Sequence, residues 1–172
     1  ERKITAGTKF KATDSVAAFV ENNWGQRANQ TTIAQTYGIL YDHSKFINYT
    51  AAFESGHVSE PGHASLKRHA ISLGALYNDQ QAQKGRLRVE YSTETGKTKD
   101  EGRKTWGVSS NFETRVNADW RIRTSADALF SRSSSGNFRD GEYFEVTLGY
   151  ARRPVLDDRF NFLMKYRYLH NL

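Results

Sequence analysis

Apolar and polar side chains alternate in steps of two along most of this chain. The stretch RFNFLMKYRYLH (residues 159–170) shows the pattern well, because Phe, Met and Tyr occupy its even positions while Lys165 and Arg167 occupy odd ones. A β-strand directs successive side chains to opposite faces of its sheet. The pattern therefore predicts a strand with one apolar face and one charged face.

The same period-two pattern recurs through the sequence, and no stretch shows a helical period. It predicts ten strands over about residues 3–12, 15–24, 31–41, 45–55, 65–77, 85–95, 104–115, 119–132, 142–152 and 159–170. We expect an all-β, antiparallel up-and-down meander of about ten strands. Residues 1–172 would form a single domain built of five repeated hairpins.

The predicted connections alternate between short and long. Short ones are TDS (13–15), DHS (42–44), NDQQAQK (78–84), NAD (117–119) and PVLDD (154–158), and long ones are GQRANQ, GHVSEPGHA, TGKTKDEGR and SSSGNFRDG. Transmembrane barrels have short turns on one side and longer loops on the other. In each short-turn hairpin the apolar positions also have the same parity on both strands, as cross-strand pairs on one face require.

Strand length decides between a soluble sandwich and a membrane barrel. The predicted strands are mostly 10–13 residues long, which suits a bilayer crossing better than the usual soluble strand of about five or six residues. Aromatic residues near strand ends are typical of interface girdles. Those residues are Trp24, Trp106, Trp120, Tyr41, Tyr77, Tyr143 and Tyr168. We therefore expect a transmembrane β-barrel, or part of a larger one.

In such a barrel the apolar set faces lipid and the charged set faces the lumen. The predicted lipid-facing residues are Leu87, Val89, Trp106, Val108, Trp120, Ile122, Phe144, Val146, Leu148, Phe160, Phe162, Met164 and Tyr166. The predicted lumen-lining residues are Arg86, Arg88, Glu90, Glu113, Arg121, Arg123, Asp127, Glu145, Lys165 and Arg167. Phe19, Leu40, Leu76, Leu129 and Leu163 break the rule, because they are apolar residues on the polar side.

The hairpin register predicts two pairs of opposite charges on the polar side. Glu113 would face Arg121 or Arg123, and Glu145 would face Lys165 or Arg167. Composition fits alternating strands, since only 37% of residues are hydrophobic while 13% are aromatic. The formal net charge of +6 is compatible with an acidic partner such as nucleic acid or a phosphate-rich lipid surface.

The sequence offers little for catalysis or cofactor binding. It has no cysteine, no phosphate-cradling glycine loop and no apolar run of the length that a spanning helix needs. Glu54, His57, Glu60 and His63 recur every three residues, but the neighbouring glycines and proline oppose the helix that would gather them around a metal. We expect no cofactor, no metal and no enzymatic activity.

Three segments carry a resemblance to a known family: ITAGTKFKATDSVAAFVE, WRIRTSADALFSRS and GYARRPVLDDRFNFLMKYRYL. They resemble Gram-negative outer-membrane β-barrels, and more narrowly the C-terminal barrel regions of very large, repeat-rich surface proteins. The tightest match is the last hairpin, through Gly149, Tyr150, Arg153, Pro154, Asp158, Arg159, Asn161, Leu163, Lys165, Tyr166, Tyr168 and Leu169. The resemblance implies a fold and a location, the bacterial outer membrane, and brings no catalytic residues.

The leading functional hypothesis is an outer-membrane barrel that acts as a membrane anchor or a pore. Its lumen arginines would favour anions, or would pair with Glu90, Glu113 and Glu145 and plug a narrow bore. Its partners would be membrane lipid and lipopolysaccharide. Because the expected turn pattern places both termini on the long-loop side, we expect part of a larger barrel or a permuted or engineered form, with further strands or a passenger domain outside the chain.

Two alternatives remain open. The first is a soluble, basic β-sheet module that binds an acidic partner; nucleic acid is disfavoured because the aromatics lie on the face opposite the arginines. The second is an outer-membrane hydrolase acting at the barrel rim, with His69 and Ser72, or Asp127 and Ser125, as candidate pairs. Neither pair has an orienting third group in the sequence.

Overall fold

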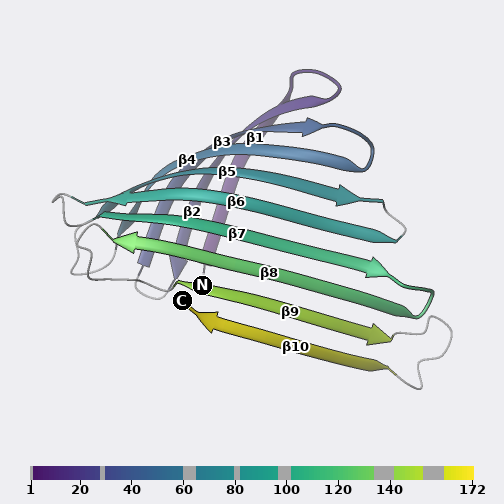
Figure 1. Cartoon of the computed structure of the whole chain (residues 1–172). Coiled ribbons are helices and arrows are strands. Elements are labelled where there is room, and N and C mark those ends of the chain that lie inside the picture. Colours follow the sequence, from purple (N-terminus) through teal and green to yellow (C-terminus); the bar gives the residue numbers. More distant parts are fainter. Residues whose placement is uncertain are drawn as a thin grey trace.

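Ten antiparallel strands form one continuous sheet in the computed structural model, which describes residues 2–27, 30–59, 65–79, 82–96, 102–133, 142–152 and 161–172 (Figure 1). Each strand pairs with its neighbours in sequence, in the order β1 to β10. The strands are β1 (Arg2–Lys11), β2 (Val16–Arg27), β3 (Gln30–Asp42), β4 (Ile47–Ser59), β5 (Leu66–Asn78), β6 (Gln83–Thr95), β7 (Gly102–Arg115), β8 (Trp120–Ser133), β9 (Tyr143–Arg152) and β10 (Phe162–Asn171). No helix among the described residues is long and apolar enough to cross a membrane.

The expected all-β meander is confirmed, with each strand close to its predicted range, but the expected alternation of connections fails near both ends. β2 continues to Arg27 and β3 begins at Gln30, so the first long connection is only residues 28–29. β9 ends at Arg152 and β10 begins at Phe162, so the last short turn is longer than expected. Backbone pairing does not require apolar side chains, so β2 continues through the polar residues that follow Trp24, beyond the end that alternation predicts.

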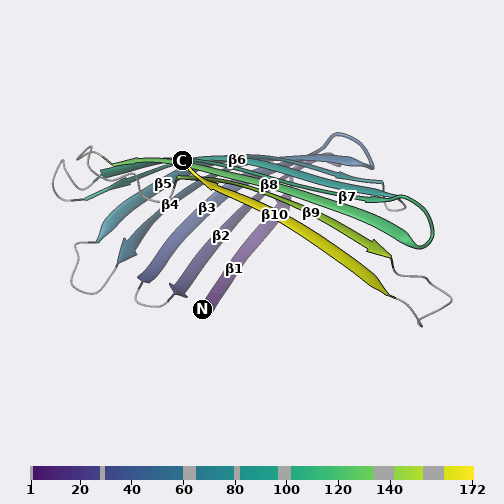
Figure 2. The ribbon, with the colours of Figure 1, turned by 60° about the horizontal axis from the view of Figure 1, so that its bottom comes forward.

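The sheet is curved but open. The middle strands form the top of an arch and β1 and β10 its two flanks (Figure 2). Each described strand between them has two neighbours, whereas β1 pairs only with β2 and β10 only with β9. The two outer strands therefore each keep one edge of backbone donors and acceptors without a strand partner.

The strands are staggered progressively across the sheet. One line of directly paired residues runs through Phe10, Ala18, Ile39, Ala51, Leu73, Val89, Val108, Ala128, Phe144 and His170. Phe10 lies one residue from the end of β1 that enters the first turn, whereas His170 lies one residue from the opposite end of the sheet in β10. A consistent stagger of this kind inclines the strands, which a sheet needs before it can close into a barrel.

The apolar face of the sheet is the exposed one. On that face Ile71 is 57% exposed and Leu73 is 60% exposed. The buried residues among those described are Ala17, Ala34, Val58, Ala70, Ser92, Glu94 and Ser131. The register places all seven on the opposite, polar face, together with the charged side chains. The usual soluble arrangement, with apolar side chains covered and polar ones wet, is therefore inverted.

Side-chain oxygens close the short turns. Thr13 Oγ1 accepts hydrogen bonds from the backbone N–H groups of Ser15 and Val16, at 3.3 and 3.0 Å. A short polar side chain does the same in three other turns, where Ser44 Oγ, Asp79 Oδ1 and Asn117 Oδ1 each accept two backbone N–H groups near the start of the next strand. Ser, Thr, Asn and Asp favour such turns because their short side chains satisfy the backbone locally.

Gly56 marks the closest approach between neighbouring strands. A Cβ atom at this position would lie 2.7 Å from the Cα and Cβ atoms of Ala34, its direct partner on β3, and would meet the backbone oxygen of Ile33. At Gly74, on β5, the nearest atoms would be Leu87 O at 3.6 Å and Thr50 Cβ at 3.7 Å, which is ordinary contact. β3 and β4 therefore require a residue without a side chain at position 56.

Replacing Gly56 by alanine is expected to lower the free energy of unfolding by about 1–3 kcal/mol, because the β3 backbone must move to admit the methyl group. The matched Gly74→Ala change adds the same methyl group where there is room, and should be neutral or stabilising by up to about 1 kcal/mol. Denaturant titration followed by tryptophan fluorescence measures both. Equal losses for the two variants would contradict the assignment of the tight contact to Gly56.

Candidate functional site: the polar face

All ten charged residues predicted to line a lumen lie on one face of the sheet. Direct pairs connect them from strand to strand: Glu113 pairs with Arg123, Asp127 with Glu145, and Gly149 with both Arg123 and Lys165. The predicted lipid-facing residues lie on the opposite face, through direct pairs such as Val89 with Val108, except Phe160, which lies outside the described residues. Tyr143 is the exception among the strand-end aromatics, because it lines a hollow on the polar face.

One arginine connects three carboxylates on this face. Arg68 on β5 reaches Glu54 Oε1 on β4 through Nε at 3.0 Å. Its Nη2 lies 2.7 Å from Glu90 Oε1 and its Nη1 lies 3.1 Å from Glu94 Oε1, both on β6. All five N–H groups of a guanidinium lie in one plane, so a single arginine can serve acceptors on both neighbouring strands.

Two further arginines complete this arrangement, which we call the Arg68 network. Arg88 Nη2 lies 2.7 Å from Glu90 Oε2, and Arg103 Nη2 on β7 lies 2.7 Å from Glu94 Oε2. The network thus contains three arginines and three glutamates, and its formal charges cancel. The Glu94 side chain is only 8% exposed. A carboxylate so deeply covered is stable when charged only because cations occupy its acceptor positions.

The register accounts for the Arg68 network. Arg68 lies directly opposite Glu94 on one side and Gly56 on the other. From this position the guanidinium reaches Glu54, the next residue of β4 on that face. Glu54, Arg68, Glu94 and Arg103 were not among the predicted lumen residues. Parity could have found them, since each lies at the parity opposite to the line of apolar residues that runs through its own strand.

The two predicted pairs of opposite charge are present. Arg121 Nη1 lies 3.5 Å from Glu113 Oε1, and Arg167 Nη2 lies 2.6 Å from Glu145 Oε2. Both pairs are diagonal rather than directly opposite, because Glu113 is paired in register with Arg123 and Glu145 with Leu169. Long arginine side chains reach one position along the neighbouring strand, so the directly opposed cation is not always the partner.

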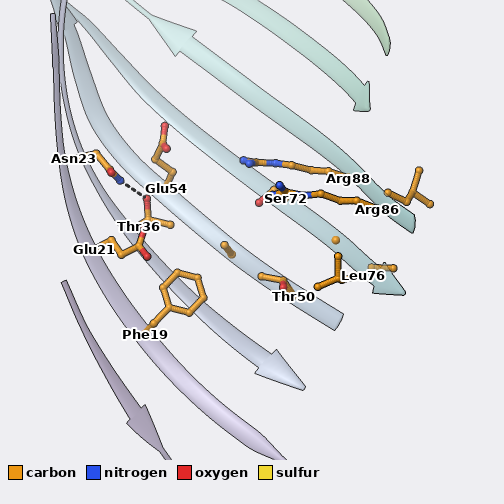
Figure 3. A pocket seen from close by; sticks show the side chains of 14 residues that line it. Phe19, Glu21, Asn23, Thr36, Thr50, Glu54, Ser72, Leu76, Arg86 and Arg88 are labelled. Atoms are coloured by element: carbon orange, nitrogen blue, oxygen red, sulfur yellow. Dashed lines mark hydrogen bonds between the residues drawn. The ribbon is translucent and has the colours of Figure 1, made fainter. Parts of the chain in front are cut away.

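The polar face of the described residues is hollowed in at least four places. The largest hollow, about 580 Å³, is lined by residues from β2 to β6. Its walls bring Phe19, Glu21 and Asn23 on β2 toward Arg86 and Arg88 on β6 (Figure 3). Residues on strands so far apart can share one hollow only if the sheet curves toward them, so the polar face is the concave one.

Apolar residues on the polar side line these hollows. The ring of Phe19 lies over Gly38, its direct partner on β3. Phe19 and Leu76 line the largest hollow, and Asn23 donates a hydrogen bond to Thr36 Oγ1 at 3.3 Å in the same wall (Figure 3). Leu129 lines the second hollow and Leu163 the third. These breaks in alternation place apolar side chains in the concavity, where Phe19 covers Gly38 but Leu163 stays 76% exposed.

The fold separates the alternative metal set and one of the two catalytic pairs, whereas Asp127 and Ser125 lie on the same face of β8. Glu54 and His57 point to opposite faces of β4, because they differ in parity, while Glu60 and His63 lie outside the described residues. Among the residues that the structure describes, no group of three or more His, Cys, Asp or Glu side chains is placed to hold a metal. His69 and Ser72 also lie on opposite faces of β5.

Aromatic side chains pair near both ends of the apolar face. Near the short turns, Trp120 stacks on Tyr150 with ring centroids 4.5 Å apart, and the Arg152 guanidinium lies 5.9 Å from the Trp120 ring. Near the other end, the Tyr91 and Trp106 centroids are 4.7 Å apart. Amphipathic rings at two levels, with aliphatic residues such as Leu73 and Val89 between them, are typical of strands that cross a bilayer.

No protein-family model matches the sequence, and the search of curated proteins finds no match. The resemblance to the barrel regions of repeat-rich surface proteins therefore stays a prediction from the residues quoted above. The geometry of the two faces must carry the functional interpretation.

Removing the central arginine should destabilise the sheet more than removing a peripheral one. Arg68→Met leaves Glu54, Glu90 and Glu94 close together with fewer cations, and we expect a loss of about 2–4 kcal/mol in the free energy of unfolding. Arg88→Met removes one contact to Glu90 at a more exposed position, and should cost less than about 1 kcal/mol. Urea unfolding of the two variants, measured in parallel, tests this prediction. Similar decreases in the free energy of unfolding would show that Arg68 is no more important to the network than Arg88.

Proposed function

We propose that this chain is a bacterial outer-membrane β-barrel that serves as a membrane anchor or pore, with lipid against its apolar face and an arginine-rich interior. The observation that supports this most directly is the inverted distribution of side chains. The large apolar residues of the sheet are exposed on its convex face, while Glu94 and Ser92 are 6% and 4% exposed on its concave face. In water such a convex face is a large unsatisfied apolar surface; in hydrocarbon it is matched to its surroundings.

Strand length supports a membrane crossing as well. β3 to β6 have 13 residues each and β7 and β8 have 14. A transmembrane strand needs about 9–11 residues when it is tilted. Each of these strands can therefore cross the hydrocarbon and still reach the interfaces, where the aromatic pairs lie.

Edge closure is the remaining requirement, because hydrocarbon offers no hydrogen bonds to free backbone groups. β1 and β10 are equal in length at ten residues each, and an even number of strands lets them meet in antiparallel orientation. Their staggered register is already that of an inclined sheet. We therefore propose that β1 pairs with β10 of the same chain in the membrane.

If the barrel forms a pore, we expect the bore to be narrow and to prefer anions because of the charges in its interior. Ten strands leave little space beyond the side chains, since about eight are just filled. The Arg68 network occupies the middle strands on the concave face without net charge. Arg86, Arg123 and Lys165 are each the fourth residue of their strands β6, β8 and β10. Three cations at one level near the short turns would favour anions there.

Tryptophan fluorescence tests the membrane proposal. Trp24, Trp106 and Trp120 all lie on the apolar face, according to the register. In vesicles whose acyl chains carry bromine, we expect their emission to be strongly quenched relative to unbrominated vesicles, because the rings would contact lipid directly. Unquenched emission from a chain that remains in the aqueous phase would instead favour the soluble basic sheet module.

Cysteine pairs test closure, and the chain has no cysteine of its own to interfere. Continuing the stagger of about one residue per strand places Ala6 opposite Tyr166. The double variant Ala6→Cys with Tyr166→Cys should form an intrachain disulfide in vesicles, detected by faster migration of a monomer on non-reducing gels. The control Ala6→Cys with Arg167→Cys places the two thiols on opposite faces and should not cross-link.

A cross-linked dimer from the first pair, or equal yields from both pairs, would contradict closure within one chain. The dimer would show that β1 and β10 pair with other copies and that the barrel is larger than one chain supplies.

A further inference from the structure

Two cations in one hollow of the concave face make no ion pair with a carboxylate of the described residues. The third hollow, about 540 Å³ in volume, is lined by residues of β7 to β10, including Arg121, Arg123 and Lys165. The two carboxylates in its wall are already engaged, Glu113 with Arg121 and Glu145 with Arg167. No carboxylate of the described residues lies within ion-pairing distance of Arg123 or Lys165. Arg123 and Lys165 therefore carry positive charges that no ion pair among the described residues neutralises, although Lys165 still interacts electrostatically with Glu145.

The two cations face each other across a glycine. Arg123 on β8 and Lys165 on β10 are both direct partners of Gly149 on β9. A Cβ atom at Gly149 would lie 3.6 Å from Arg123 O and 4.0 Å from Arg123 Cβ, so the backbone has room for a side chain that the sequence does not provide. The result is a gap between two cationic side chains, with the hydroxyl groups of Ser125 and Thr147 in the same hollow.

Like charges on one concave face repel, and the repulsion grows when the surroundings have a lower dielectric constant than water. The ion pairs of Glu113 and Glu145 neutralise Arg121 and Arg167, and the attraction between Glu145 and Lys165 reduces the remaining repulsion only in part. An anion in the gap above Gly149 would neutralise both remaining cations at once. Arg supplies paired N–H donors that match two oxygens of an oxyanion, and Lys supplies a mobile point charge.

We propose that this hollow is a binding site for a phosphate-type dianion, inorganic phosphate or a small phosphate monoester, held between Arg123 and Lys165 above Gly149. This proposal rests on the proposed function in one respect only. Closure of the sheet into a barrel would enclose the hollow in the lumen, near the short turns. Its residues come from three neighbouring strands that are paired without closure of the sheet.

Titration calorimetry with inorganic phosphate tests the site, using the full chain in detergent micelles or, if it proves soluble, in buffer. Arg123→Gln and Lys165→Gln should each weaken phosphate binding by about tenfold, because each removes a charge-assisted hydrogen bond. Lys104→Gln makes the same charge change on the opposite face of β7 and should leave binding within about twofold of the parent. Chloride at the same ionic strength should not compete as sulfate does.

Gly149→Leu separates the geometry from the charge. It fills the gap without removing a cation, and we expect it to weaken phosphate binding at least as much as loss of Lys165, with the β-sheet circular-dichroism spectrum retained as a check on folding. Phosphate affinity that survives Gly149→Leu, or that falls equally in Lys104→Gln, would overturn the site. Because binding is measured whether or not the chain enters vesicles, loss of this site and failure of the membrane proposal give different results.

Discussion

Cross-strand register is the constraint on which the rest of this structure depends. Directly paired residues face the same side, so a slip of one residue in any pairing would exchange the apolar and charged faces of every strand beyond it. The line from Phe10 to His170 shows that no such slip occurs across all ten strands. Because the register is maintained on every strand, the apolar residues form one continuous surface and the charged residues gather on the other face.

The concave side supplies what a single sheet lacks, which is a core. Its buried residues are mostly small, such as Ala34 and Ala70, and they let neighbouring side chains converge without a second layer. The Arg68 network then links β4 to β7 through charge-assisted hydrogen bonds. In a soluble domain one hydrophobic core stabilises the fold. Here polar contacts on the concave face and apolar contacts on the convex face together have that role.

Sequence alternation was sufficient to predict the strand number, the meander and the face of nearly every residue in it, because period two is a local property. It was insufficient for strand ends, as at Arg27 and Gln30, where backbone pairing continues without apolar side chains. It also missed the Arg68 network, although parity was available, because the identity of a partner depends on how far each side chain reaches across the neighbouring strands. Curvature and edge pairing are collective properties of the sheet, and the alternation of residues along a strand does not predict them.

The charge on the concave face is distributed unevenly, and this bears on what the face can do. In the Arg68 network each arginine forms ion pairs with glutamates, so the network stabilises the sheet and carries no net charge. Near the short turns, Arg86, Arg123 and Lys165 share the fourth position of β6, β8 and β10, and none of them makes an ion pair with the described residues. Matched charges serve the fold, whereas unmatched ones raise its self-energy unless something else neutralises them. Arg123 and Lys165 both lie beside Gly149, and neither makes an ion pair within the described part of the chain, although Glu113 is the register partner of Arg123 on its other side. A mobile anion above Gly149 would neutralise both cations, which the pairing of the strands does not do.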